Sequence, residues 1–227
     1  PVIASTGGGP LGLFADVPSF ESWARSRGVD VDHLPRVLVT AHSLHLLFQQ
    51  PAVVEALVRG LEKRGLLAAG IVDTGEGLTA SRDSYEALAI AFAPKLVVHT
   101  CHSPDTAAFR EKLGVPHLHS VFFSRQSIDE WRQSPTGLAG RDWMFQVATQ
   151  EVLGAIEPIV CAGTKHGGST GEPVIPLDDR IEHLTARAAA WVRLSTKPPA
   201  EKRVAVVYYD REMGKSELMR GSTTGMF

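Results

Sequence analysis

The sequence predicts an α/β fold, a doubly wound and mostly parallel sheet of Rossmann or flavodoxin type with helices on both faces. From Pro35 onward, short runs of β-branched residues alternate with amphipathic stretches, which is the pattern of βα units around a parallel sheet. The expected strands are almost continuously apolar, as is typical of strands buried on both faces. With 227 residues, of which 44% are hydrophobic, the chain is long enough to bury a full core.

Local signals place the elements in order. Pro51 fits the first turn of a helix, the apolar residues between Val53 and Leu61 share one face of it, and Gly65 can close it in a left-handed cap. Gly114 can close a later helix in the same way. We expect strands at 36–41, 66–73, 96–99, 115–123, 156–162 and 202–209, and helices at 51–64, 81–92 or 83–92, 104–114, 128–133, 142–153 and 177–196.

These elements suggest four parts. Residues 1–34 would be the tail of a preceding unit, and residues 35–165 one α/β domain with helices on both faces. Residues 166–176 belong to a stretch rich in Gly, Pro, Ser and Thr, which is typical of a flexible loop that covers a site or of a simple linker. Residues 177–227 would be a long helix and the first strand of a next α/β unit. Because the chain begins without Met and stops soon after that strand, we expect it to be part of a longer protein.

Composition excludes several classes of function. The formal charge of −2 and the absence of a basic block argue against a nucleic-acid partner. No apolar run reaches the ~18 residues of a membrane span, and the N-terminal stretch does not resemble a signal peptide, so we expect a cytoplasmic protein. Cys101 and Cys161 lack the spacing of a zinc site and are expected to be buried free thiols.

Histidines gather where the expected strands end. His42 and His45 follow the first strand, His99 and His102 the third, and His117 and His119 lie on the fourth. Ligands of open parallel sheets bind beyond the carboxyl ends of the strands, and neutral imidazole is a good ligand for transition metals. One interpretation is therefore a site in which His42, His99 and His102 ligate a metal and His42, His45, His99, His102 and His119 bind a metal-containing cofactor. The alternative is that these histidines are structural and bond to the backbone.

The stretch 124–163 carries a recognisable pattern: a serine, an acidic residue before Trp, Ser-x-x-Gly-Leu, a helix ending in Val-Ala-x-x-Glu, and Gly-x-Ile-Glu-Pro-Ile-Val. Its positions are Ser127, Glu130, Trp131, Ser134, Gly137, Leu138, Val147, Ala148, Glu151, Gly154, Ile156, Glu157, Pro158, Ile159 and Val160. This pattern resembles the large, substrate-binding subunits of aerobic-type cobaltochelatase and of magnesium chelatase. A looser likeness runs from about Phe14 to Lys215 and includes the long helix at 177–196.

The resemblance implies a chelatase-like domain at 35–165. It further implies part of the tetrapyrrole-binding subunit of an ATP-dependent chelatase, which inserts a divalent metal (Co, Mg or Fe) into the ring. ATP would act only through partner ATPase subunits, and the fragment alone would be inactive. The alternative is a haem- or corrinoid-binding homologue that acts as a binding protein or removes metal without ATP.

Metal insertion needs a base to take up pyrrole protons, yet the sequence assigns no catalytic residue. The candidate carboxylates are Glu130, Asp142, Glu151 and Glu157, and each has a structural interpretation; Asp142, for example, stands where a helix N-cap is expected. The aromatic residues Phe122, Phe123, Trp131, Trp143 and Phe145 could stack on a ring but are more typical of core packing. Lys215 follows no glycine-rich phosphate loop, since Tyr209 replaces the required glycine, and no hydrolase or dehydrogenase motif is present.

Overall fold

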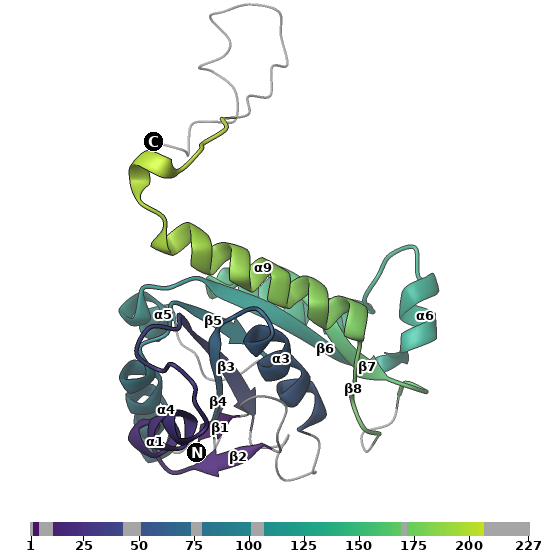
Figure 1. The fold of residues 1–227 in the computed structure, drawn as a ribbon. Coiled ribbons are helices and arrows are strands. Elements are labelled where there is room, and N and C mark those ends of the chain that lie inside the picture. Colours follow the sequence, from purple (N-terminus) through teal and green to yellow (C-terminus); the bar gives the residue numbers. More distant parts are fainter. Residues whose placement is uncertain are drawn as a thin grey trace, which may run out of the picture. The chain divides into compact units, whose positions relative to one another are not determined.

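The computed structural model describes residues 2–4, 11–42, 51–73, 79–100, 107–168 and 172–206. Within them eight strands form one sheet (Figure 1). The strands are β1 Val2–Ala4, β2 Gly12–Phe14, β3 Arg36–His42, β4 Leu67–Asp73, β5 Leu96–His99, β6 His117–Ser127, β7 Ile156–Thr164 and β8 Ile175–Pro176. The helices are α1 Val17–Ser26, α3 Ala52–Glu62, α4 Thr79–Phe92, α5 Ala107–Leu113, α6 Ile128–Gln133, α7 Gly140–Trp143, the π-helical η1 Met144–Ala148, α8 Thr149–Val152, α9 Asp178–Thr196 and the 3₁₀-helical η2 Pro199–Glu201.

The sheet has the order β2-β1-β4-β3-β5-β6-β7-β8. Its five central strands are parallel, and β1, β2 and β8 pair antiparallel at the two edges. Numbered among themselves, the parallel strands follow the order 2-1-3-4-5, which is that of flavodoxin-like doubly wound sheets. The predicted fold class is confirmed.

Helices cover both faces because successive side chains of a strand point in opposite directions. On β3, Val37 and Val39 enter a core shared with α3 and α9, whereas Leu38 between them enters a core shared with α1, α4 and α5. The apolar face predicted for α3 is buried in the first of these cores. A third and smaller core joins the far ends of β6 and β7 to α6 and η1.

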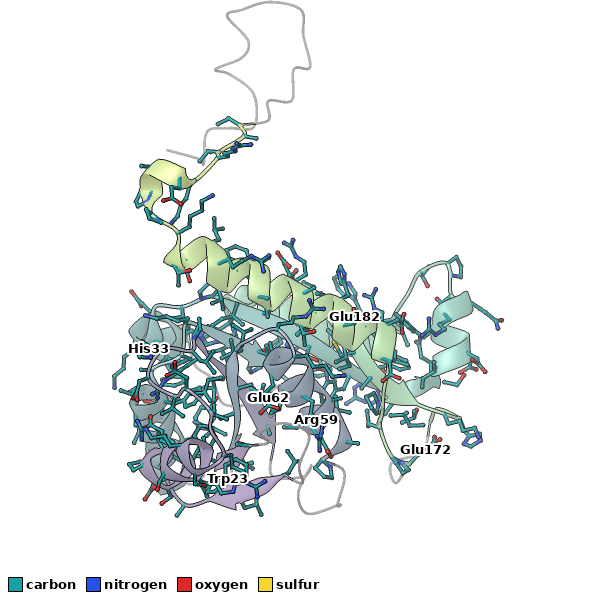
Figure 2. All side chains as sticks on the ribbon, viewed as in Figure 1. Trp23, His33, Arg59, Glu62, Glu172 and Glu182 are labelled. Atoms are coloured by element: carbon teal, nitrogen blue, oxygen red, sulfur yellow. The ribbon has the colours of Figure 1, made fainter. Side chains whose placement is uncertain are left out.

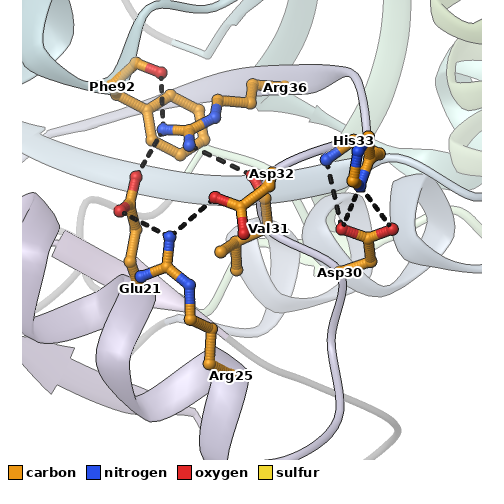
Figure 3. Close-up of polar contacts among 8 residues, drawn as sticks. All are labelled: Glu21, Arg25, Asp30, Val31, Asp32, His33, Arg36 and Phe92. Atoms are coloured by element: carbon orange, nitrogen blue, oxygen red, sulfur yellow. Dashed lines mark hydrogen bonds and ion pairs between the residues drawn. The ribbon is translucent and has the colours of Figure 1, made fainter.

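The N-terminal segment is part of the same sheet, since β1 pairs with β4. Figure 3 shows how α1 is fastened: Arg36 at the start of β3 forms an ion pair with Glu21 of α1 at 2.7 Å. Arg36 also donates hydrogen bonds to the carbonyl groups of Val31 and Phe92. The sheet thus incorporates residues that we expected to be the tail of a preceding unit.

The chain divides into two compact units, Pro1–Ser195 and Thr196–Phe227. In the first, α9 packs on the main core through Ile181, Leu184 and Ala188, although we expected it to open the next unit. In the second, residues 202–206 are not in a strand, so that part of the predicted strand 202–209 is wrong; residues 207–209 lie outside the described residues. Part of the predicted loop 166–176 forms β8, which pairs with β7.

Most element boundaries agree with prediction within a few residues, and α6 matches its predicted range. Two elements differ. β6 continues to Ser127, four residues beyond its predicted end, because Ser127 pairs with Thr164 of β7, which itself runs two residues beyond its predicted end. The predicted helix at 142–153 begins at Gly140 and is interrupted by the π-helical turn η1. Among the described residues, no helix combines the length and the apolar character needed to cross a membrane.

Candidate functional site

Two histidines meet at the carboxyl end of β5. Because β5 and β6 are parallel and His99 lies in register with His119, both side chains project from the same face of the sheet. Their Nδ1 atoms are 3.2 Å apart, and the His119 Nδ1 also lies 3.1 Å from the His99 carbonyl oxygen. A contact of this length between two ring nitrogens requires that one ring carry the proton and the other accept it.

Arg110 of α5 contacts the histidine pair and completes a buried network of hydrogen bonds. Its guanidinium donates to the carbonyl oxygen of Leu153 at 3.0 Å and to the side-chain oxygen of Gln150 at 3.1 Å. The Arg110 Nη2 also lies 3.4 Å from His99 Nε2. Arg110 therefore ties α5 and the end of α8 to the histidine pair, and His99, His119, Arg110 and Gln150 are all buried.

His117 lies two residues before His119 on the same face of β6 and is also buried. Burial lowers the pKa of both His117 and His119 to about 4, and the positive charge of Arg110 contributes in the same direction. For His119, hydrogen bonds to the backbone of His99 and Gln146 oppose the shift of its pKa. Both imidazoles are thus neutral near pH 7, the state in which imidazole can accept a proton or a metal.

The structure brings together only part of the predicted histidine set. His99 and His119 are in contact. His42 ends β3, in register with Asp73 of β4, but its side chain is outside the described part of the structure, as are all of His45 and His102. The described residues contain no group of three or more His, Cys, Asp or Glu side chains able to hold a metal, so the set of His42, His99 and His102 as metal ligands stays a prediction.

The ends of β3 and β5 are fastened to each other just before these positions. The backbone N–H of Thr100 donates to the Thr40 hydroxyl at 3.1 Å, and the Thr100 hydroxyl donates to the Thr40 carbonyl oxygen. Both threonines are buried. The edge of the sheet at which the histidines were predicted to gather is therefore closely joined between β3 and β5.

The four candidate carboxylates lie on or beside helices, and three of them contact neighbouring side chains. Glu130 closes a capping box with Ser127, whose backbone and hydroxyl hydrogen bonds lower the pKa of Glu130. Asp142 is not the predicted N-cap: Ala139 occupies that position and Asp142 lies inside α7, with one carboxylate oxygen 3.6 Å from Arg125 Nε. Glu157 accepts hydrogen bonds from α9, and Glu151 is exposed on α8.

The aromatic residues divide into two groups. Phe122 and Phe123 are buried, and Trp131 packs against Phe123 with ring centroids 5.6 Å apart, so the core interpretation is confirmed for these three. It is wrong for Trp143 and Phe145, which are 54% and 45% exposed. Trp143 ends α7, and Phe145 lies in the π-helical turn η1 that follows it.

Sequence reasoning missed Arg110 and Gln150, which complete the buried network. A signal for Arg110 was available: it lies three residues before Leu113, and hence on the apolar face of a short amphipathic helix. No pattern pointed to the π-helical turn. Cys161 is buried as predicted, and burial raises the pKa of its thiol to about 12; Cys101 lies outside the described residues.

A sizeable cavity lies elsewhere in the domain. It has a volume of about 620 Å³ between α3 and α9 and includes Arg59, Arg64 and Glu182 in its lining; Figure 2 shows Arg59 on α3 and Glu182 on α9. These charges already have partners, because Arg59 pairs with Glu55 and Arg64 with Glu182. The histidine network is therefore the stronger candidate site.

Fold and site together define a doubly wound α/β protein with a buried histidine network beside the carboxyl edge of its sheet. The family model described as CobN/Magnesium Chelatase matches residues 5–225. The chain belongs to this family.

Similar proteins include a magnesium-chelatase subunit of Chlorobaculum parvum, 28% identical over 214 residues that cover 88% of this chain and 16% of the relative. The chloroplastic magnesium-chelatase subunit ChlH of Oryza sativa is 31% identical over 159 residues, or 69% of this chain and 11% of the relative. The aerobic cobaltochelatase subunit CobN of a Sinorhizobium species is 29% identical over 167 residues, or 68% and 13%. The chain thus spans between about a tenth and a sixth of the length of these relatives.

Among solved structures, the catalytic subunit of cobaltochelatase from Mycobacterium tuberculosis is similar, with a TM-score of 0.59 and 21% sequence identity. The match covers 75% of this chain and 15% of that subunit. At this identity the likeness establishes a shared fold.

Proposed function

We propose that this chain is part of the large, tetrapyrrole-binding subunit of a metal chelatase that inserts a divalent metal into the ring. The observation that carries the proposal is the family match over residues 5–225, together with relatives named as subunits of magnesium chelatase and cobaltochelatase. Partner ATPase subunits would supply the energy of ATP hydrolysis, the chain alone would not insert metal, and the complex would work in the cytoplasm.

Within this chain we assign ring binding to the carboxyl edge of the sheet, through His42, His45, His99, His102 and His119. Metal, as substrate, would pass through His42, His99 and His102. What supports this assignment is that His99 and His119 are in contact and that His119 is neutral near pH 7. Since His99 and His119 are both buried, their part would be indirect: they would orient the histidines of the edge that contact the ring.

The test is a titration of the chain with metal-free porphyrin and with haem, followed by the Soret absorption band. We expect saturable binding, weakened about tenfold or more when His42 and His102 are both replaced by Ala, since a lost ligand bond of this order costs ~1.4 kcal/mol or more. The control is His33→Ala, because His33 is exposed and pairs with Asp30 far from the edge.

The outcomes separate the alternatives. Binding of metal-free porphyrin that depends on these histidines supports the chelatase subunit. Binding of haem alone supports instead a haem-binding homologue that works without ATP. If neither ligand binds, or if the double variant binds as well as the His33→Ala control, ring binding at this edge is excluded.

A further inference from the structure

A small cavity lies beside the π-helical turn, apart from the buried histidines. It has a volume of about 290 Å³ and is lined by Arg125, Arg141, Asp142, Phe145 and Gln146. Small-molecule pockets typically measure ~300–1,000 Å³, so this cavity can hold one side group and the adjoining part of a ring but not a whole macrocycle. Neither the predicted histidine site nor the proposed function involves it.

The two arginines of this cavity make few close contacts of their own. Arg125 is half exposed and forms only a loose ion pair with Asp142, because its Nε lies 3.6 Å from that carboxylate, which is longer than a hydrogen bond. Arg141 stacks over the Phe145 ring at 5.6 Å and makes no hydrogen bond or ion pair within the described part of the chain. By contrast, Arg36 and Arg187 both bind carboxylates at 2.8 Å or less.

Charge in the lining favours an anion. Arg125 and Arg141 contribute two positive charges, and Asp142 contributes one negative charge, which leaves one positive charge in excess. A planar guanidinium can bind a carboxylate through two parallel hydrogen bonds. A single carboxylate therefore fits the cavity better than a cation or a phosphate dianion.

An aromatic surface adjoins the arginines. Trp143, Met144 and Phe145 are each about half exposed, and they follow one another along α7 and η1. These exposed aromatic side chains lie next to Arg125 and Arg141. A flat ring can stack on them while its carboxylate reaches the arginines. A ligand that bears both groups would use the whole of this surface.

The backbone at this place is also unusual. Phe145 and Gln146 belong to the π-helical turn Met144–Ala148, and such turns occur often at functional sites. Asp142 Oδ2 and Gln146 Oε1 are buried without a hydrogen-bond donor among the described residues. Buried acceptors without partners are rare in proteins; a carboxylate carries no donor, so these two oxygens are not the contacts that would hold it.

We propose that this cavity is a binding site for a carboxylate attached to a flat aromatic ring. Arg125 and Arg141 hold the carboxylate, and Phe145 and Trp143 contact the ring. On the proposed function, on which this second step rests, the ligand is the carboxylate-bearing edge of the tetrapyrrole. The site then fixes the rotation of the ring in its plane, since a macrocycle can be turned so that only its carboxylate side chains face the arginines.

The first experiment uses a small probe, 2-naphthoate, and its neutral amide as the matched ligand. Binding is followed by heteronuclear NMR on the chain and on Arg125→Gln and Arg141→Gln variants. We expect naphthoate to shift the resonances of residues 141–146 in the wild type, to bind roughly tenfold more weakly to either variant, and the amide to bind weakly to all. The control is Arg27→Gln, because Arg27 also stacks over an aromatic ring, Trp23, at 5.2 Å, but on α1.

Equal binding of naphthoate and amide, or unchanged affinity in both arginine variants, would overturn the site. The second experiment compares a porphyrin dicarboxylate with its dimethyl ester. Preference for the dicarboxylate that disappears in Arg125→Gln and Arg141→Gln extends the site to the tetrapyrrole.

The two experiments distinguish failure of the carboxylate site from failure of ring binding. If naphthoate binds as expected but no porphyrin binds, the carboxylate site stands and the assignment of this chain to ring binding fails. If the porphyrin binds equally well as acid and ester and in every arginine variant, ring binding stands and its proposed contact with this cavity is wrong.

Discussion

Glu157 and Arg187 join the first residues of β7 to the middle of α9. The Arg187 Nε donates to the Glu157 carboxylate at 2.8 Å, and the Trp191 indole N–H donates to the same carboxylate at 2.9 Å. Glu157 does this from a left-handed backbone with φ of 47°, a conformation that costs a non-glycine residue on the order of 1 kcal/mol or more. The ion pair and the indole hydrogen bond offset this cost, and Arg187 is the main cause of the lowered pKa of Glu157.

We expect Glu157→Gln to lower the free energy of unfolding by about 1 kcal/mol, because it removes the charge but keeps the strained backbone. Urea denaturation measures this. The control is Asp179→Asn, which breaks the exposed pair with Arg132 and should cost less than about 0.5 kcal/mol. Equal effects of the two substitutions would show that Glu157 does not hold α9.

Stability should fall as the pH is lowered from about 6.5 to 4. An unfolded histidine takes up its proton near pH 6.5, whereas His117 and His119 in the folded state do so near pH 4. Between these values the unfolded state binds more protons, so acid destabilises the fold, and below pH 4 these two groups add nothing further. The loss is on the order of 3 kcal/mol for a fully shifted histidine.

The variant His117→Leu tests this directly, since neither ring nitrogen of His117 has a hydrogen-bond partner among the described residues. Replacing such a buried polar group with an apolar one should leave stability at pH 7 unchanged or raised. It should also flatten the dependence between pH 6.5 and 4, measured by urea denaturation at a series of pH values. A slope as steep as that of the wild type would remove His117 as a cause.

Arg110→Leu should destabilise the protein by about 2–4 kcal/mol, because the carbonyl oxygen of Leu153 and the side chain of Gln150 lose their donor inside the protein. The same change should raise the pKa of His117, since the charge of Arg110 helps to lower it. Thermal unfolding and a histidine NMR titration measure the two effects. Arg110→Lys keeps the positive charge but loses the guanidinium. In this variant the pKa of His117 should stay close to its wild-type value, whereas the stability should stay below that of the wild type.

Gly163→Ala should be destabilising by about 1–3 kcal/mol through overpacking, because a Cβ at this position of β7 would overlap the Phe123 ring. Reducing the ring by Phe123→Leu should make the alanine tolerable. A double-mutant cycle of unfolding free energies measures this coupling. Additive effects of the two substitutions would contradict the close contact.

Sequence was sufficient for the layers of the fold because strands buried on both faces and helices with one apolar face leave strong periodic patterns. Val37, Leu38 and Val39 illustrate this, since their alternation divides them between two cores. The contact of His99 with His119 depends on the register of β5 and β6, which a parallel pair joined through a helix does not specify locally. Strand ends alone therefore suggested neighbours without showing which ring nitrogens would meet.

Other features could not be read because their cause is tertiary. The π-helical turn at Met144–Ala148 has no sequence signature. Trp143 and Phe145 are exposed there, although their residue types favour burial. The last residues of β6 were missed for a similar reason: Ser124 and Arg125 are polar and exposed. The strand continues past them because Ser127 pairs with Thr164 of β7 and the Gly168 N–H donates to the Ser124 carbonyl oxygen.

The small third core, at β6 and β7, should make this part of the domain less stable than the part built on the two larger cores. Segments held by few buried side chains open at a lower free energy than the whole protein unfolds. The stretch from α6 to α8, which carries Arg141 and Phe145 of the arginine cavity, can therefore exchange its amide hydrogens and reshape around a ligand while β3, β4 and β5 remain folded. The sheet would then keep its structure when a ligand binds, and the segment between β6 and β7 would adjust to the ligand.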